Sequence, residues 1–330
     1  MADHKDLLVV ENLTMDFQGT KRFLEKKPNV RAVSNVSFSV KEGETFGVVG
    51  ESGCGKTTLG KCIVRLLKPT AGKLHYNDDG EWKDLLDLKK RESFELRRKV
   101  QIVFQDPYAA LNPQHTILEA FDEPMRVHGI GGGKEERKKL IAEALIRVNL
   151  QPEYMYRYPH EFSGGQRQRI CVAKALVLQP KLIICDEPVS ALDVSVQAQL
   201  LNLMKRLQRE LGVTYIFIAH DLAVVQYMSD RIGVMYLGNM VELADSGELY
   251  ENPLHPYTLA LLSAVPVPVV NGKRDRIILE GDVPSPMDPP SGCPFHLRCA
   301  KCMEICKQEK PELRELRDGH FIACHLYDAK

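Results

Sequence analysis

The sequence has no excess of charge, because its 44 Lys and Arg residues are matched by 44 Asp and Glu residues. A balanced chain creates no overall positive field, so its composition gives no reason to expect nucleic-acid binding. It has no uninterrupted apolar run approaching the ~20 residues of a membrane-spanning helix. The first residues, Met-Ala-Asp-His-Lys-Asp, do not resemble a secretory signal. We therefore expect an intracellular chain that does not itself cross the bilayer but can dock on a membrane protein.

One glycine-rich stretch carries a phosphate-binding motif. Residues 50–58 read Gly-Glu-Ser-Gly-Cys-Gly-Lys-Thr-Thr and fit G-x-x-x-x-G-K-[ST]. Its backbone N–H groups can converge on an anion, and the following helix adds its positive end. Lys56 is expected to reach the β- and γ-phosphates of ATP, and the Thr57 hydroxyl to hold Mg²⁺. The predicted ATP-binding residues here are Gly50, Glu51, Ser52, Gly53, Cys54, Gly55, Lys56, Thr57 and Thr58.

The pattern of apolar runs predicts an α/β fold. A strand over 45–50 and a helix over 57–67 flank the glycine-rich stretch, and further strands alternate with helices, which favours a mainly parallel sheet covered on both faces. The predicted fold is a P-loop nucleoside triphosphatase with an antiparallel β subdomain, an inserted helical subdomain and a small loop-rich C-terminal domain. The predicted nucleotide-binding domain spans residues 1–250, with the helical insertion at about 107–165, and the cysteine-containing C-terminal domain spans 251–330. Other predictions are edge strands at 7–10 and 32–40, strands within 73–88, helices at 134–148 and 195–211, and a hairpin at 231–241.

Polar residues follow four predicted strands at the edge where ligands of parallel sheets bind. Asp186 is expected to order Mg²⁺ together with Thr57 and Gln105. Glu187 is expected to act on the attacking water as a general base or orienting group, and Gln105 can reach both the metal and that water. His220 suits a contact to the γ-phosphate. The adenine is expected to stack on an aromatic residue, either Phe17 at the end of the first strand or Phe23.

The segment Ser163-Gly-Gly-Gln-Arg-Gln-Arg resembles the signature motif of ATP-binding-cassette (ABC) ATPases. The phosphate loop, Gln105, Leu-Ile-Ile-Cys-Asp-Glu, Ser-Ala-Leu-Asp193 and His220 match the remaining motifs of that family in order. The resemblance implies a head-to-tail dimer in which the signature of one protomer binds the γ-phosphate held by the other. The implied partner-facing residues are Ser163, Gly164, Gly165, Gln166 and Asp193. Whether the dimer is homomeric or heteromeric stays open.

A second resemblance covers the tail. Residues 252–258 (Asn-Pro-Leu-His-Pro-Tyr-Thr), 292–299 and 319–325 are similar to the C-terminal region of oligopeptide and dipeptide importers, a group that includes nickel importers. The resemblance implies an ATPase that drives peptide uptake from the inner face of the membrane. Its implied partners are two integral-membrane permeases, a second ATPase subunit and, indirectly, an extracytoplasmic solute-binding protein. The alternatives are a nickel importer and a non-transport ABC ATPase, such as one with a metal-sensing tail.

Five of the nine cysteines lie in the last forty residues. Cys293, Cys299, Cys306 and Cys324 have the spacing C-x5-C-x6-C-x17-C, with Cys302 as a fifth thiol. A small domain with little apolar core can be stabilised by a metal, so a [4Fe–4S] cluster, Zn²⁺ and no metal all remain open. Some relatives in the importer group carry such a cluster. The other four cysteines, Cys54, Cys62, Cys171 and Cys185, are expected to be buried small residues.

Overall fold

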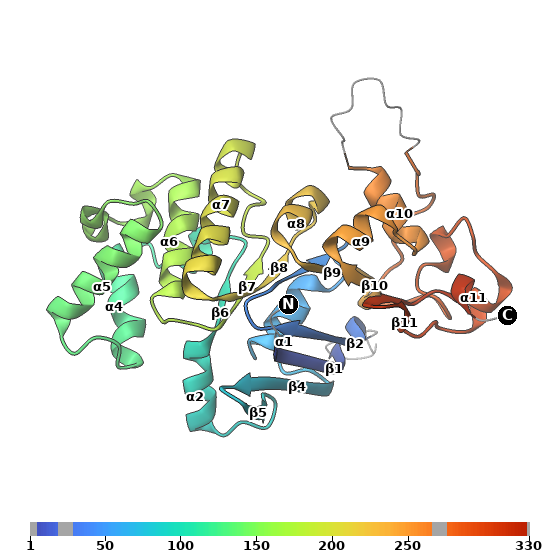
Figure 1. Ribbon diagram of the computed structural model, residues 1–330, viewed down its shortest axis with the longest axis horizontal. Helices are drawn as coiled ribbons and strands as arrows, with labels where there is room; N and C mark the ends of the chain where they lie inside the picture. Colours follow the sequence, from blue (N-terminus) through green and yellow to red (C-terminus); the bar gives the residue numbers. More distant parts are fainter. Residues whose placement is uncertain (1–4, 19–28, 266–275, 329–330) are drawn as a thin grey trace, which may run out of the picture. The chain divides into compact units, whose positions relative to one another are not determined.

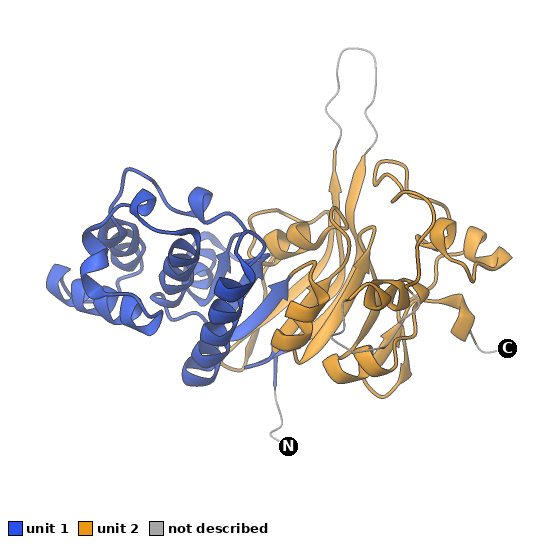
Figure 2. Ribbon diagram, turned by 90° about the horizontal axis from the view of Figure 1, so that it is seen from above, with its two compact units in different colours: residues 1–7, 41–44, 87–218 blue, residues 8–40, 45–86, 219–330 orange. Residues whose placement is uncertain are grey.

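The computed structural model describes residues 5–18, 29–265 and 276–328. Contacts between residues divide the chain into two compact units (Figure 2). Unit 1 comprises residues 1–7, 41–44 and 87–218, and unit 2 comprises residues 8–40, 45–86 and 219–330. Within the described ranges, no helix has both the length and the apolar character that crossing a membrane requires.

Unit 1 contains three parallel strands in the order β6, β7, β8. They are β6 (Val100–Val103), β7 (Leu182–Asp186) and β8 (Thr214–Ile218), with Cys185 opposite both Val103 and Phe217. Every residue of β7 and β8 is buried, as expected of parallel strands with both faces covered. The helices α2 (Lys90–Lys99), α6 (Gly164–Leu176) and α7 (Val194–Leu211) complete this part of the unit. The helix predicted at 195–211 is confirmed.

A helical insertion follows β6 in unit 1 (Figure 1). It contains α3 (Pro107–Ala110), α4 (Ile117–Val127), α5 (Lys134–Arg147) and two single-turn 3-10 helices, η1 (Pro152–Tyr156) and η2 (Pro159–Glu161). The helix predicted at 134–148 is confirmed. The first turn of α4 is closed by a capping box, in which Thr116 Oγ1 accepts from Glu119 N at 3.3 Å and Glu119 Oε2 accepts from Thr116 N at 2.7 Å.

Unit 2 contains a mixed sheet. In it β3 (Thr45–Val49) runs parallel to β9 (Arg231–Tyr236), and β10 (Asn239–Asp245) returns antiparallel to β9, which confirms the predicted hairpin. The next strands are β12 (His320–Ile322), antiparallel to β10, and β11 (Arg314–Arg317), antiparallel to β12. The last hairpin of the chain therefore extends the sheet that carries the phosphate loop.

A second, antiparallel sheet lies almost wholly in unit 2, with strand order β2-β1-β4-β5. Its strands are β1 (Asp6–Phe17), β2 (Val30–Lys41), β4 (Ala71–Asp78) and β5 (Glu81–Asp84). The antiparallel subdomain is thus present, but the prediction of an edge strand at residues 7–10 is wrong. Those residues begin the twelve-residue strand β1, which is paired on both sides, whereas β2 lies at the edge as predicted.

Five short helices lie in the described part of unit 2. They are α1 (Lys56–Ile63), α8 (Leu222–Met228), α9 (Ser246–Glu251), α10 (Pro256–Ser263) and α11 (Glu304–Gln308), with 3-10 turns η3 (His296–Arg298) and η4 (His325–Tyr327). Helix α1 ends before the predicted residue 67. Arg65 takes the left-handed conformation (φ 59°), and Leu66 N donates to Lys61 O at 2.9 Å, which closes the helix end.

Candidate active site

The phosphate loop of unit 2 has a backbone that requires its glycines. Gly50, Gly53 and Gly55 have φ of 153°, 79° and 103°, values that residues with a side chain rarely adopt. A Cβ on Gly50 would lie 2.1 Å from Met235 O, and one on Gly55 would lie 2.0 Å from Ala32 O. The loop is therefore held in close contact with its surroundings, and its curvature can turn N–H groups toward a phosphate.

Lys56 lies inside this loop and is 4% exposed. Its Nζ donates to Gly50 O at 2.7 Å and to Glu51 O at 3.0 Å. The N-terminus of α1 has no side-chain cap, because Gly55 occupies the N-cap position. Uncapped amides at a helix N-terminus favour an anion, so this loop offers both an ammonium group and backbone donors to a phosphate group.

Two further residues that the sequence predicts to contact ATP, His220 and Phe17, lie in unit 2. Ala219 N donates to Val48 O at 3.2 Å, so the exposed His220 follows directly from a residue bonded to β3, the strand that leads into the loop. Phe17 ends β1 and is 39% exposed. Its neighbour Asp16 forms an ion pair with Arg31 at 2.8 Å. The next residue, Ala32, lies against Gly55 of the phosphate loop. The alternative aromatic residue, Phe23, lies outside the described residues.

In unit 1 Gln105 contacts Glu187, which directly follows Asp186. Gln105 Nε2 donates to Glu187 Oε2 at 3.0 Å and to Ser190 Oγ at 3.4 Å. Asp186 ends β7 and is 4% exposed. Glu187 follows in the left-handed conformation, with φ 47°, and its N–H donates to Ile218 O at 2.9 Å. Left-handed backbone at a non-glycine residue costs ~1–3 kcal/mol and persists where surrounding contacts impose it.

The signature residues of unit 1 lie at helix starts. Ser163 caps α6, with its Oγ accepting from Gln166 N at 3.3 Å while Gln166 Oε1 accepts from Ser163 N at 3.0 Å. A Cβ on Gly165 would lie 2.3 Å from Val196 Cγ1 of α7, so α6 and α7 pack closely there. Asp193 caps α7, and its hydrogen bond from the Ser195 hydroxyl, at 2.7 Å, lowers its pKa. Ser163 and Asp193 are both exposed to solvent.

The C-terminal cysteines gather in unit 2. Cys293 N donates to Cys306 O at 2.8 Å, and Cys302 N donates to Cys299 O at 3.1 Å. Burial, with the nearby Cys306 and Cys324 adding to it, raises the pKa of Cys293 to about 12. All nine cysteines lie in the described ranges and are free thiols, and Cys54, Cys62, Cys171 and Cys185 are buried as predicted. Among the described residues, no group of three or more His, Cys, Asp or Glu side chains is placed to hold a metal ion.

Two residues that contact the phosphate loop were not predicted from sequence. Arg298 Nη1 donates to Glu51 Oε2 at 2.7 Å and Nη2 donates to Oε1 at 3.2 Å, while Tyr257 Oη accepts from Glu51 N at 2.9 Å. Both residues come from the tail, within segments whose resemblance to importers was noted. Spacing alone gives no signal that connects residue 51 with residue 257 or 298.

Comparison with known proteins identifies the family. The model of the ABC transporter family matches residues 33–190, and that of the oligopeptide/dipeptide transporter C-terminal region matches residues 241–306. Oligopeptide transport ATP-binding protein AppF of Bacillus subtilis is 54% identical over 92% of this chain and 92% of its own length. The chain belongs to the ATP-binding proteins of ABC transporters. Oligopeptide transport ATP-binding protein OppF of Salmonella typhimurium, another member, is 49% identical over 99% of this chain and 98% of its own length.

A solved ABC structure supports the same assignment. The dimeric ATP-binding cassette MJ0796, in a post-hydrolysis state bound to ADP and Pi, is 31% identical with a TM-score of 0.62, and the match covers 73% of this chain and 99% of that one. The chain is thus an ABC ATPase with the P-loop nucleoside triphosphatase fold, as the motifs predicted. The individual site residues and the domain boundaries stay predictions.

Proposed function

We propose that this chain is the ATP-binding subunit of a membrane importer of oligopeptides or dipeptides. One observation carries the proposal: the cassette and the importer-type C-terminal region occur in one chain that aligns along nearly its whole length with oligopeptide transport ATP-binding proteins. In this role the chain lies peripherally at the inner face of the membrane. It works with two permease subunits and a second ABC ATPase subunit, and a solute-binding protein delivers the peptide from outside.

The roles proposed for the ATP site follow from the side-chain chemistry. Lys56 and the amides of the loop bind the phosphates. Thr57, Gln105 and Asp186 would supply oxygen ligands to Mg²⁺, which when bound would neutralise charge on the phosphates. Gln105 Nε2 donates to Glu187, so the amide oxygen of Gln105 would be the atom available as a ligand. Glu187 acts on the attacking water as a general base or orienting group.

The remaining contacts to ATP come from both protomers of the proposed dimer. Phe17 stacks on the adenine, and His220 contacts the γ-phosphate. The signature residues 163–166 and Asp193 bind the nucleotide held by the partner. The exposed positions of Ser163 and Asp193 at helix starts support this role, because both side chains are accessible to a partner.

We also propose that Cys293, Cys299, Cys306 and Cys324 are the ligands of a metal group, either a [4Fe–4S] cluster or Zn²⁺. Support comes from four thiols in one small segment, where Cys299, Cys306 and Cys324 each raise the pKa of Cys293 electrostatically. Burial is the largest cause of the raised pKa. The thiol is therefore protonated at neutral pH, and a metal must displace its proton to bind. Among the described residues the thiols are not placed as a formed metal site, so the choice between a cluster and zinc is left to the experiment.

Anaerobic purification tests the cysteine proposal. Iron, acid-labile sulfide and zinc are measured per chain, together with the visible spectrum. About four iron and four sulfide with broad brown absorbance establish the cluster, and one zinc in a colourless protein establishes the alternative. Cys306→Ser is expected to lose the metal, whereas Cys302→Ser, which changes the fifth thiol, keeps it. Folded protein without any metal contradicts the proposal and leaves the ATPase assignment intact.

The transport proposal is tested by uptake in the source organism. Cells whose chromosomal copy carries Glu187→Gln are given labelled dipeptides and oligopeptides, and nickel uptake is measured in parallel. We expect peptide uptake to fall to background while nickel uptake stays at the wild-type level. Loss of nickel uptake alone assigns the nickel alternative instead. Wild-type uptake of both solutes, with the variant protein present and inactive as an ATPase, removes the importer proposal.

A further inference from the structure

Glu51, the second residue of the phosphate loop, is held by the C-terminal part of unit 2. Its carboxylate takes a forked pair of hydrogen bonds from Arg298, at 2.7 and 3.2 Å, and its backbone N–H donates to Tyr257 Oη at 2.9 Å. The Arg298 side chain is 8% exposed and that of Glu51 is 28% exposed. A forked, largely buried guanidinium–carboxylate pair fixes both position and orientation, unlike an exposed ion pair.

Arg298 and Tyr257, which bond to Glu51, are themselves fixed by a buried aromatic cluster. Tyr236 at the end of β9 lies 4.8 Å from Tyr257 and 5.2 Å from Phe295 between ring centroids, and Tyr257 lies 5.4 Å from Phe295. All three side chains are at most 1% exposed. Phe295 is the N-cap residue of η3, the turn that ends at Arg298. The cluster therefore joins a sheet strand, α10 and the cysteine-bearing segment, and Tyr257 connects it to Glu51 of the phosphate loop.

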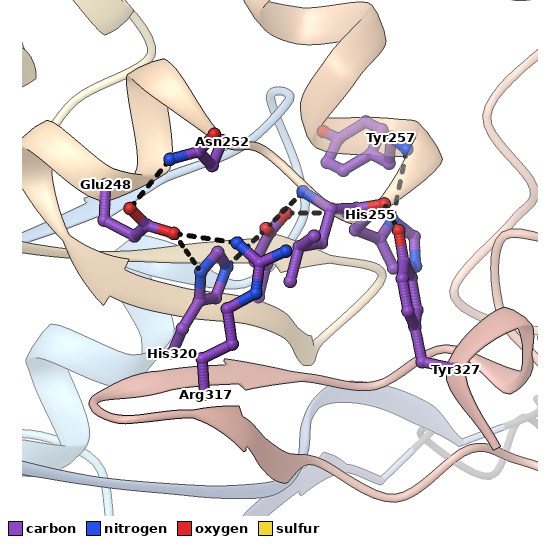
Figure 3. A network of polar contacts seen from close by, with 9 residues as sticks. Glu248, Asn252, His255, Tyr257, Arg317, His320 and Tyr327 are labelled. Atoms are coloured by element: carbon purple, nitrogen blue, oxygen red, sulfur yellow. Dashed lines mark hydrogen bonds and ion pairs between the residues drawn. The ribbon is translucent and has the colours of Figure 1, made fainter. Parts of the chain in front are cut away.

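The start of α10 is bonded to the sheet through a polar network that includes His255, Tyr257 and His320 (Figure 3). Glu242 of β10 is 0% exposed and accepts from Leu254 N at 2.7 Å, from His255 N at 3.0 Å and from His320 Nε2 at 2.8 Å. His255 Nδ1 in turn accepts from Tyr257 N at 3.1 Å and caps the helix. The His255-Pro256-Tyr257 segment thus connects the sheet core to the amide of Glu51 through consecutive hydrogen bonds.

We propose that Arg298 and Tyr257 are positioning residues that hold the phosphate loop in its nucleotide-binding shape through Glu51. The converging N–H dipoles of the loop repel one another. Lys56 Nζ bonds to the carbonyls of Gly50 and Glu51, and the tail holds Glu51 through other atoms, its N–H and its carboxylate. A preformed loop binds its ligand with a smaller ordering cost.

The inference rests on ATP binding by the ABC ATPase and is independent of the transported solute. It also gives the importer-type tail a function inside the ATPase itself. The phosphate loop contacts ATP in the ground state and in the transition state of hydrolysis. Disturbing the shape of the loop therefore weakens binding of both states. Positioning variants are therefore expected to raise KM for ATP and Kd for ADP together, with kcat at saturating ATP nearly unchanged.

The test uses the full-length protein and measures KM, kcat, ADP affinity and the melting temperature. Arg298→Met keeps the aliphatic length but removes both bonds, and we expect it to raise KM and Kd about tenfold. Arg298→Lys is expected to recover part of the loss. Tyr257→Phe removes only the hydroxyl, so a smaller rise, roughly threefold, is expected. Arg314→Met is the matched control, since Arg314 of the same tail forms an exposed pair with Asp328 at 2.6 Å and should leave KM unchanged.

A double-mutant cycle separates positioning from general damage to the fold. Glu51→Gln combined with Arg298→Met should raise KM no further than the larger of the two single changes, because both remove the same contact. Glu51→Gln and Tyr257→Phe also keep the test available if Arg298→Met fails to fold. A wild-type KM in Arg298→Met, additive effects in the double variant, or an equal rise in Arg314→Met would each overturn the proposal.

Discussion

The phosphate loop of unit 2 and the signature residues of unit 1 are held in opposite ways. The loop is restrained over long range: Lys56 is 4% exposed, Gly50 and Gly55 lie against carbonyl groups of Met235 and Ala32, and Glu51 is bonded to residues more than 200 positions away. Ser163 and Asp193 are exposed. Each side chain accepts a hydrogen bond from the backbone three residues later, in the first turn of the helix that it caps. The loop is shaped by the fold of its own chain, whereas the signature residues are presented on the surface.

This difference has a physical reason. Converging amides and a buried ammonium group must be held together before the phosphate arrives, so the binding loop needs long-range restraint. Residues that bind a partner's nucleotide need only be kept in a fixed local conformation, and a helix cap is sufficient for that. The contrast predicts that nucleotide binding and hydrolysis can be separated by substitutions.

Glu187→Gln is expected to give the largest effect. The variant should bind ATP with wild-type affinity but lose turnover by about 10²–10⁴-fold, because an amide cannot accept the proton of the attacking water. In the proposed dimer it should also trap the closed, ATP-bound state. Steady-state ATPase assays and equilibrium ATP binding measure the two properties. Glu210→Gln, on the exposed part of α7, should behave as wild type; equal turnover in both variants removes Glu187 from catalysis.

Lys56→Ala is expected to give the complementary result. Loss of a charged hydrogen-bond donor to phosphate should weaken ATP and ADP binding by roughly 10–100-fold. The loop carbonyls of Gly50 and Glu51 lose their bond to Nζ at the same time. Isothermal titration with both nucleotides measures the change, and Lys61→Ala, on the same helix, is the control. If Lys56→Ala retains full affinity, the predicted phosphate contact is wrong.

His320→Gln is expected to destabilise unit 2 in a pH-dependent way. Burial lowers the pKa of His320, but hydrogen bonds and ion pairs with Glu242 and Glu248 outweigh it and raise the pKa overall. The stabilisation by His320 is therefore complete below its ordinary pKa of about 6.5 and is lost as pH rises through the raised pKa. At pH 6 the substitution should lower the free energy of unfolding by about 2 kcal/mol, and by less at pH 8.5.

Denaturant unfolding of wild type and variant at the two pH values measures this effect. His255, whose pKa is lowered to about 4 by burial, works in the opposite direction, since its contribution is lost as pH falls from about 6.5 toward 4. The surface pair of His75 and Glu11, 3.8 Å apart, provides the control His75→Gln. A destabilisation by His320→Gln that is equal at both pH values contradicts a protonated His320 in the native state.

Ser163→Ala should give the smallest change in stability. Removing the cap of α6 costs about 1 kcal/mol in the free energy of unfolding. ATP binding to the phosphate loop should stay at the wild-type level, while turnover falls because Ser163 is proposed to contact the partner's nucleotide. Thermal unfolding, ATP titration and ATPase rate measure the three quantities. Thr116→Ala, which removes the cap of α4, is the control with the same structural cost and no expected loss of turnover.

The local parts of the site could be predicted from the sequence. The phosphate loop is a continuous run of nine residues, and Asp186 and Glu187 directly follow an apolar strand, so pattern and chemistry coincide. The sequence did not predict helix α2. Because Leu96 is its one buried residue, the basic segment 94–99 has no stripe of apolar residues that would indicate a helix. The hold on Glu51 was also not predictable, because its partners lie 206 and 247 residues away and only the folded chain brings them together.

In the proposed dimer, one chain binds ATP unaided but hydrolyses it only with a partner ATPase surface. The most direct test measures nucleotide bound per chain, turnover per chain and molar mass by light scattering over a wide range of protein concentration. The account predicts one nucleotide per monomer, with negligible turnover until dimers form or a second ABC ATPase subunit is added. Full turnover by a chain that stays monomeric at every concentration would contradict it.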